Sequence, residues 1–274
     1  ARLLRRRAPL LPPSAGSRFW SAHQRFFRCL VTALKLPTLH AMLREGLAAG
    51  KSVVVGLLGT GEAYNSAPTE PSPVKAEAGG GGGAAAAAEG DGVAAAVETT
   101  PPAPSAILKA VISSVLFPEA APTHREVAPL LARAAALDLP PNPLDDIMRT
   151  LAADGVPAVE LSGRQEVAPH RNAQRARFQS GEATVAVISD AASTGVSLHA
   201  TRGADGTQPV RPRLHITLEL NWSADRQIQQ LGRTHRTGQA CPPEHVLLVS
   251  DVSGEKRFVS TIARRLHSLG ALSG

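Results

Sequence analysis

The segment that decides the fold is Leu214–Leu231, LHITLELNWSADRQIQQL, in which a strand-forming stretch leads directly into a helix-forming one. Its first seven residues predict a buried β-strand, and Ser223 is a suitable N-cap for a helix that starts at Ala224. Two other apolar segments, Val53–Leu58 and Thr184–Ser189, have the composition of buried strands. These three segments predict the centre of a sheet.

Helical patterns alternate with the strands along the chain. We expect helices over 23–36, 38–49, 107–116, 126–137, 144–152, 168–178 and 255–269, and further strands over 156–161 and 246–249. This alternation favours an α/β fold, in which a parallel sheet has helices on both faces. In such a sheet the working loops lie beyond the carboxyl ends of the strands, so the segments after Ser189 and Leu220 are the first candidates for chemistry.

The α/β pattern is interrupted between residues 64 and 105. This stretch contains a glycine run at 79–83, an alanine run at 84–88 and prolines at 101, 102 and 104. Such a composition cannot bury enough apolar surface to offset its ordering entropy, so we predict a disordered insertion. The predicted organisation is a basic, poorly ordered start (1–20), the first part of the α/β domain (21–63), the insertion (64–105) and the remainder of that domain (106–274).

The overall composition points to an anionic partner. The formal charge is +6 and the isoelectric point is about 10, which favours nucleic acid, although a bias toward arginine in the encoding genome is an alternative explanation. Cys29 and Cys241 lack metal-ligand spacing and are expected to be reduced thiols. No run of 18 apolar residues is present, so no membrane-spanning helix is expected. Because the chain opens with Ala1 rather than Met, we interpret its basic start as an internal segment of a longer product rather than a transit peptide.

A P-loop is not recognisable in the sequence. Gly46–Ser52 has three residues rather than four between its first glycine and Gly-Lys, and it closes a predicted helix where a P-loop would open one. A helix C-cap at Gly50 is the better interpretation. No DExH or DExD run is present either, so these 274 residues show no means of binding ATP alone.

Two loops follow predicted strands at their carboxyl ends. The glycines of Gly59–Glu62 would let the backbone approach a ligand, although a simple turn explains them equally well. Ala191–Leu198 offers small hydroxylic residues and Gly195, whose N–H and O–H groups are suitable donors to phosphate oxygens. Ordinary strand-to-helix loops often have the same composition.

The strongest signal is a polar stripe after the third strand. Gln229, Arg233 and Arg236 are spaced i, i+4, i+7, which predicts that they share one face of a helix. A solvated face is the alternative, but Ile228 and Leu231 are expected to pack the other side of this helix on the sheet. Two arginines on one stripe repel each other unless an anion is near, and arginine suits bidentate phosphate recognition.

The segment 222–239 resembles motif VI of superfamily 2 helicases, whose core is Q-x-x-G-R-x-x-R, and its flanks are similar to Swi/Snf-type remodelling ATPases. The resemblance to the strawberry notch family is closer and covers most of the chain outside the insertion. The matching strings are WSAHQRFF (20–27), VVVGLLGTGEA (53–63), NPLDDI (142–147), VAVISDAASTGVSLHA (185–200), LELNWSADRQIQQLGRTHR (218–236) and GEKRFVSTIARRLHSLGAL (254–272). One departure is Leu58-Gly59, where the family usually has Gln-Ser before Thr-Gly-Glu.

The resemblance implies a RecA-like lobe, the C-terminal half of a two-lobe motor. In the family pattern Gln229 and Gly232 belong to the motif VI helix. Arg233 and Arg236 would reach a nucleotide held by the other lobe, with Arg236 as the arginine finger, and Asp225 matches the aspartate that precedes this motif in remodelling ATPases. Gly232, Asp225 and Gly195 are the expected cofactor-binding positions.

The resemblance also implies partners. Ser193 and Thr194, in motif V, are expected to contact nucleic acid. The expected cofactor is ATP with Mg²⁺, bound mainly by an N-terminal helicase lobe that carries the P-loop and DExH motif. DNA or RNA, chromatin and transcription factors are the other expected partners, in the nucleus. Two alternatives stay open, a non-catalytic co-regulator that keeps the fold and a simple basic nucleic-acid-binding domain.

Overall fold

The computed structural model describes residues 15–58, 104–117, 125–162, 168–189, 196–202 and 210–268. Its strands form one parallel five-stranded sheet in the order β2-β3-β1-β4-β5. The strands are β1 (Ser52–Leu57), β2 (Ala158–Leu161), β3 (Val185–Ser189), β4 (Arg213–Thr217) and β5 (Glu244–Leu247). The predicted fold class, a RecA-like parallel sheet with helices, is confirmed.

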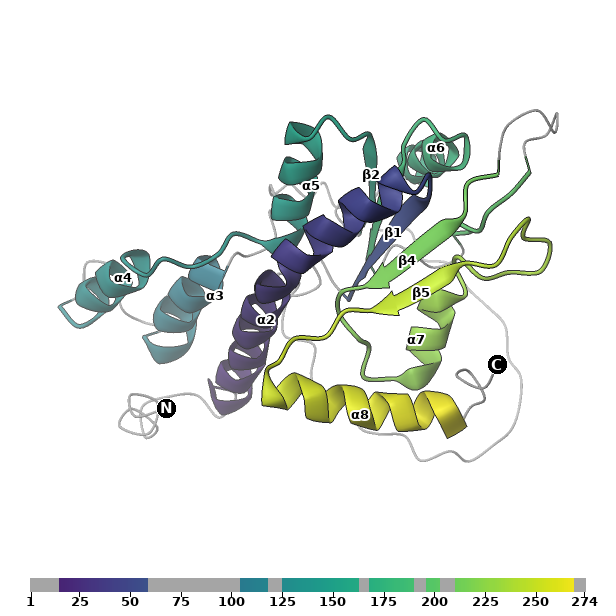
Figure 1. Ribbon diagram of the computed structural model, residues 1–274. Helices are drawn as coiled ribbons and strands as arrows, with labels where there is room; N and C mark the ends of the chain where they lie inside the picture. Colours follow the sequence, from purple (N-terminus) through teal and green to yellow (C-terminus); the bar gives the residue numbers. More distant parts are fainter. Residues whose placement is uncertain are drawn as a thin grey trace, which may run out of the picture.

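Helices cover both faces of the sheet (Figure 1). The helical elements are α2 (Ala15–Ala48), α3 (Pro104–Ala110), the π-helix η3 (Val111–Leu116), α4 (Val127–Ala135), α5 (Pro143–Ala153), α6 (Ala168–Gln179), α7 (Ala224–Leu231) and α8 (Ser253–Ser268). On one face, Val53 and Val55 of β1 pack with leucines of α2 and α5. On the other face, Val54 packs with Phe178 of α6, and α7 lies beside β4.

The first helix is longer than the sequence predicted. The two helices expected over 23–36 and 38–49 are one helix, α2, which continues through Pro37. An interior proline removes a backbone hydrogen bond and costs about 3 kcal/mol. On the same helix Leu36, Leu39 and Leu43 are buried, at 6%, 0% and 2% exposure. Burying each of these side chains contributes roughly 1.5–3 kcal/mol, so together they outweigh the cost of the proline.

No membrane-spanning helix is expected from the sequence, but by length and composition alone α2 is long and apolar enough to be one. Its carboxyl-terminal half lies in the protein core, where Leu39, Leu43 and the buried Lys35 face the sheet and its neighbouring loops. This half is therefore explained as a core helix.

Other boundaries differ by a few residues. The helix expected over 107–116 is divided into α3 and η3, which pack with α4 in a cluster beside α2. The strand expected to extend to Leu220 ends at Thr217, and the last strand lies at 244–247 rather than 246–249. The insertion predicted at 64–105 falls almost entirely outside the described residues, so its disorder and the domain boundaries around it stay predictions.

Candidate functional site

The helix that carries the motif VI sequence, α7, begins where the sequence predicted. The Ser223 hydroxyl accepts a hydrogen bond from the Arg226 N–H at 3.4 Å, as an N-cap does. Asp225 lies in the first turn, where a carboxylate interacts favourably with the helix dipole. Asp225 is about two turns, or about 10 Å along the helix axis, before Gly232. It therefore does not lie beside the arginines, which follow Gly232.

The sheet-facing side of α7 is polar, and the expectation that Ile228 and Leu231 pack on the sheet is wrong. Gln227 and Gln230 are buried there instead, at 0% and 2% exposure, while Ile228 packs toward α8. Gln227 Nε2 donates to Thr217 Oγ1 at 3.5 Å and to Gln230 Oε1 at 3.2 Å. Each amide thereby has partners, which makes its burial tolerable.

Gly56 makes room for this arrangement. A Cβ atom at Gly56 would lie 3.0 Å from Gln230 Nε2, which donates to the Leu57 carbonyl oxygen at 3.2 Å. Gln227 Oε1 in turn accepts from the Asn221 N–H at 3.0 Å. A glycine inside an otherwise β-branched strand was the one sequence signal that a close approach occurs here.

The arginines do not share a helical face with Gln229, because α7 ends at Leu231. Gly232 is the C-cap residue, and Arg233 and Thr234 continue in a tighter turn through hydrogen bonds to the carbonyl groups three residues earlier. Glycine is a poor helix former, so the i, i+4, i+7 spacing loses its meaning at this position. Gln229 and Arg236 are both exposed, but Gln229 lies on α7 and Arg236 lies beyond the turn that follows it.

The segment after the helix is tied to the segment after β3. The Leu198 N–H donates to the Arg233 carbonyl oxygen and the Ala240 N–H to the Ala200 carbonyl oxygen, each at 2.8 Å. Arg236 Nη1 donates to Ser197 Oγ at 2.6 Å. Ser193, Thr194 and Gly195 lie outside the described residues, so the structure joins the two segments through the residues that follow them, Ser197, Leu198 and Ala200.

The arginines are not at the carboxyl edge of the sheet, where the sequence analysis looked for chemistry. A helix that follows a parallel strand returns toward the start of that strand, and α7 covers about 12 Å in its eight residues. The Leu198 carbonyl oxygen, next to the arginine segment, accepts from Nε of Arg213, the first residue of β4, at 3.0 Å. The candidate site therefore lies toward the amino-terminal half of β4.

Positive charge dominates the surroundings of Arg236. Among the described residues, no carboxylate forms an ion pair with Arg236, whose side chain contacts the Ser197 hydroxyl and, at 3.4 Å, the Gly232 carbonyl oxygen. Burial lowers the pKa of the nearby His199, and the charges of Arg236 and Arg213 lower it further. Burial also lowers the pKa of Arg213 to about 10. A cationic group without a carboxylate partner in the described part of the chain suits an incoming anion such as phosphate.

The effect on His199 gives a direct check of this electrostatic environment. Arg236→Gln is expected to raise the pKa of His199 toward the ordinary value of 6.5, and burial and Arg213 should keep it below that value. The measurement is a pH titration of the imidazole C–H resonances by NMR, with Arg226→Gln as a control. An unchanged His199 titration in the Arg236 variant would show that the two side chains are not neighbours in solution.

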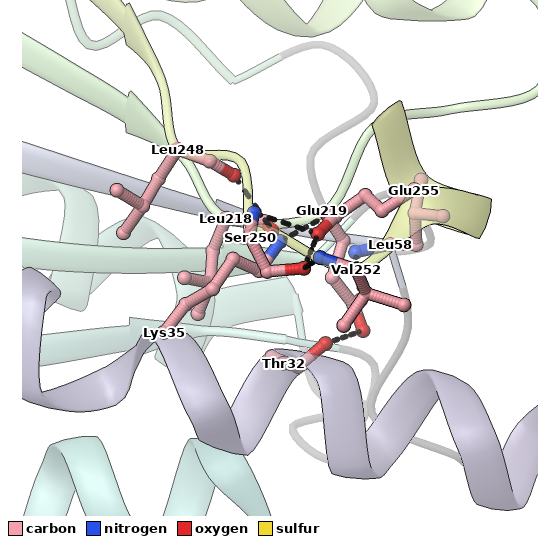
Figure 2. Close-up of polar contacts among 9 residues, drawn as sticks. All are labelled: Thr32, Lys35, Leu58, Leu218, Glu219, Leu248, Ser250, Val252 and Glu255. Atoms are coloured by element: carbon pink, nitrogen blue, oxygen red, sulfur yellow. Dashed lines mark hydrogen bonds and ion pairs between the residues drawn. The ribbon is translucent and has the colours of Figure 1, made fainter. Parts of the chain in front are cut away.

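Sequence reasoning missed a polar network that fastens α2 to the carboxyl ends of the strands (Figure 2). Lys35, only 4% exposed, donates from Nζ to the Leu218 carbonyl oxygen, to the Leu248 carbonyl oxygen at 3.2 Å and to Glu255 Oε1 at 2.7 Å. Burial raises the pKa of Glu255, but hydrogen bonds from Lys35 and Ser250 outweigh this effect and lower it. One lysine thus connects α2 with β4, β5 and α8.

A second carboxylate completes the network. Glu219 accepts from Thr32 Oγ1 at 2.8 Å and from the Leu58 N–H at 2.9 Å (Figure 2). Leu58 is the last described residue before the predicted Gly59–Glu62 turn, which lies outside the described residues. The network orients the end of β1, and its partners are too far apart in sequence for any local pattern to indicate them.

The P-loop-like segment is a helix end, as predicted. Gly50 has φ 72°, and its N–H and that of Lys51 donate to the carbonyl groups of Leu47 and Gly46 at 2.9 and 3.0 Å. Lys51 forms an ion pair with Glu244 at the start of β5. Its amine is therefore engaged in holding the sheet edge.

Comparisons with known proteins confirm the resemblance to the strawberry notch family. A family model described as the C-terminal domain on strawberry notch homologues matches residues 149–274. Protein strawberry notch homolog 1 from Rattus norvegicus is 30% identical over 357 aligned positions, which cover 95% of this chain and 27% of that protein. Protein strawberry notch homolog 2 from Homo sapiens is 34% identical over 353 aligned positions, which cover 95% of this chain and 26% of that protein. The chain thus spans about a quarter of the length of these relatives.

This chain is also similar to a part of a solved structure. The C-terminal part of the Fun30 ATPase domain is 18% identical with a TM-score of 0.36, and the match covers 43% of this chain and 35% of that chain.

Proposed function

Because this chain belongs to the strawberry notch family and carries its helicase-like C-terminal domain, we propose that it is the second lobe of an ATP-driven motor. In this proposal its motif VI arginines act on a nucleotide that an N-terminal P-loop lobe holds. ATP and Mg²⁺ are bound mainly by that other lobe, and these 274 residues contribute the charges that complete the site.

The observation that carries the proposal is the state of Arg236. It is an exposed cation anchored by the Ser197 hydroxyl, with no carboxylate partner among the described residues. A guanidinium placed beside a γ-phosphate spreads the charge that develops during phosphoryl transfer, and such a finger contributes roughly 10³–10⁵ in rate. Arg236 is the proposed finger, and Arg233 is a second phosphate contact.

The remaining motif residues have supporting roles. Gly232 ends α7, so the two arginines lie in the segment that follows the helix. Gln229 is exposed on α7, and the motif VI resemblance assigns it to the nucleotide side. Gly195 and Asp225 are assigned to the nucleotide side by family resemblance, and Ser193 and Thr194 are assigned to nucleic acid.

The macromolecular partner that we propose is DNA or RNA, in the context of transcription and chromatin in the nucleus. The formal charge of +6 and the isoelectric point of about 10 support an anionic partner. A motor of this class couples nucleic-acid contact to nucleotide turnover, so binding should weaken steeply as salt is added.

The test is ATP turnover by a two-lobe protein in which this chain follows the P-loop lobe of a strawberry notch relative. We expect turnover above that of the P-loop lobe alone, further stimulated by DNA or RNA. The alternative is a non-catalytic co-regulator, which is motivated by the lack of a P-loop motif in this sequence. It would be favoured if the two-lobe protein bound nucleic acid but hydrolysed no more ATP than the P-loop lobe alone.

A further inference from the structure

We propose that Thr234 is a positioning residue for the arginine finger, held by His215 and His245 so that the arginine turn has one fixed place on the sheet. Thr234 lies between Arg233 and Arg236 and is 0% exposed. The inference rests on the proposed function, because it concerns how the finger is oriented.

The geometry links the turn to two strands. Thr234 Oγ1 lies 2.9 Å from Nδ1 of His215, a fully buried residue of β4. It also lies 3.0 Å from Nε2 of His245 in the edge strand β5 and 3.1 Å from the Leu231 carbonyl oxygen. One hydroxyl thus joins β4, β5 and the last residue of α7.

Hydrogen counting makes the arrangement specific. A hydroxyl has one hydrogen to donate and two lone pairs that accept. With its hydrogen on the Leu231 carbonyl oxygen, Thr234 accepts from both imidazoles, so His215 is protonated on Nδ1 and His245 on Nε2. Both rings are neutral in this network. Burial lowers the pKa of His215 to about 3. Burial also lowers the pKa of His245, and the charge of His235 lowers it further.

Among the residues that the structure describes, His215 has Thr234 as its hydrogen-bond partner. Its Nε2 is buried without a hydrogen bond and lies beside Gly56, where an apolar side chain would avoid the loss of hydration. A leucine or phenylalanine at this position would lose the bond to Thr234. We therefore infer that His215 holds Thr234 in place as well as filling space in the core.

The functional consequence follows from the place of Thr234 in the chain. Arg236 is two residues beyond it, and within the described ranges the exposed guanidinium contacts Ser197 and the Gly232 carbonyl oxygen. A misplacement of about 1 Å at a catalytic group is enough to lower a rate by roughly 100-fold. Fixing the backbone at Thr234 limits that misplacement before the two lobes meet.

The test compares Thr234→Val, which keeps the shape and removes the hydroxyl, with Thr234→Ser, which keeps the hydroxyl. In the two-lobe protein we expect Thr234→Val to lower kcat for ATP hydrolysis by roughly 10- to 100-fold while KM stays within about 2-fold, and Thr234→Ser to restore most of the turnover. In an Arg236→Ala background, Thr234→Val should cause no further loss, because it acts through Arg236.

Two results for the Thr234 variants would overturn the inference. Wild-type kcat in Thr234→Val, or the same fold-loss with and without Arg236, would show that Thr234 does not position the finger. An Arg236→Ala variant with full turnover would instead contradict the proposed function itself. If Thr234→Val does not fold, His245→Ala against His245→Gln makes the same comparison, since a glutamine amide can take the place of Nε2; equal turnover in these two variants and the wild type would overturn the inference.

Discussion

Arg236→Lys is expected to lower kcat for ATP hydrolysis in the two-lobe protein by about 10³-fold or more, as loss of an arginine finger does in related phosphoryl-transfer enzymes. Lysine keeps the charge but lacks the planar fork that meets two phosphate oxygens at once. It also cannot reproduce the Nη1 contact to Ser197 and the Nε contact to the Gly232 carbonyl oxygen together. The measurement is steady-state turnover at saturating ATP and nucleic acid.

A matched control comes from α8. Arg264 is also exposed, and its Nε donates to a backbone carbonyl group, that of Ser260, at 3.3 Å. Arg264→Lys should leave turnover within about 2-fold of the wild type, since surface changes away from a site have small effects. If Arg233→Lys abolished turnover while Arg236→Lys did not, the finger would have to be reassigned to Arg233.

Lys35→Met is expected to lower the free energy of unfolding of the 274-residue chain by about 3–5 kcal/mol, the usual result of removing one partner of a buried ion pair. Methionine fills a similar volume but leaves Glu255, whose side chain is 14% exposed, without its counter-charge. The Leu218 and Leu248 carbonyl oxygens also lose a donor. The measurement is urea denaturation at neutral pH, followed by circular dichroism.

Arg44→Met is the control for this stability effect. Arg44 also extends from α2 and pairs with Asp154, but the two side chains are 66% and 38% exposed. An exposed pair contributes about 0–1 kcal/mol, so this variant should be close to the wild type. A loss from Lys35→Met as small as that of Arg44→Met would show that the Lys35 network does not fasten α2 to the strands.

The strands and the start of α7 could be predicted because their signals are local. A β-branched run such as Val53–Val55 is typical of a strand in a parallel sheet whose two faces are covered by helices. Ser223 caps a helix through its own hydroxyl. The continuity of α2 through Pro37 could not be predicted, because it depends on leucines that meet partners more than a hundred residues away.

The candidate site was predictable in part. The motif VI sequence placed the two arginines after β4, but the helical spacing assumed a helix that Gly232 ends. The buried faces were reversed, because Gln227 and Gln230 find their partners in Asn221, Thr217 and the Leu57 carbonyl group. Polar groups become suitable for burial only when such long-range partners exist, and a single sequence does not show them.

We propose that Arg236 acts on the transition state of phosphoryl transfer at a nucleotide in the other lobe. The most direct measurement compares the affinity of the two-lobe protein for Mg·ADP with aluminium fluoride, a transition-state analogue, with its affinity for Mg·ADP alone. Arg236→Ala is predicted to weaken binding of the analogue by roughly 100-fold or more and to change the affinity for Mg·ADP by less than about 3-fold. Equal affinities of the wild type and the variant for the analogue would contradict the account.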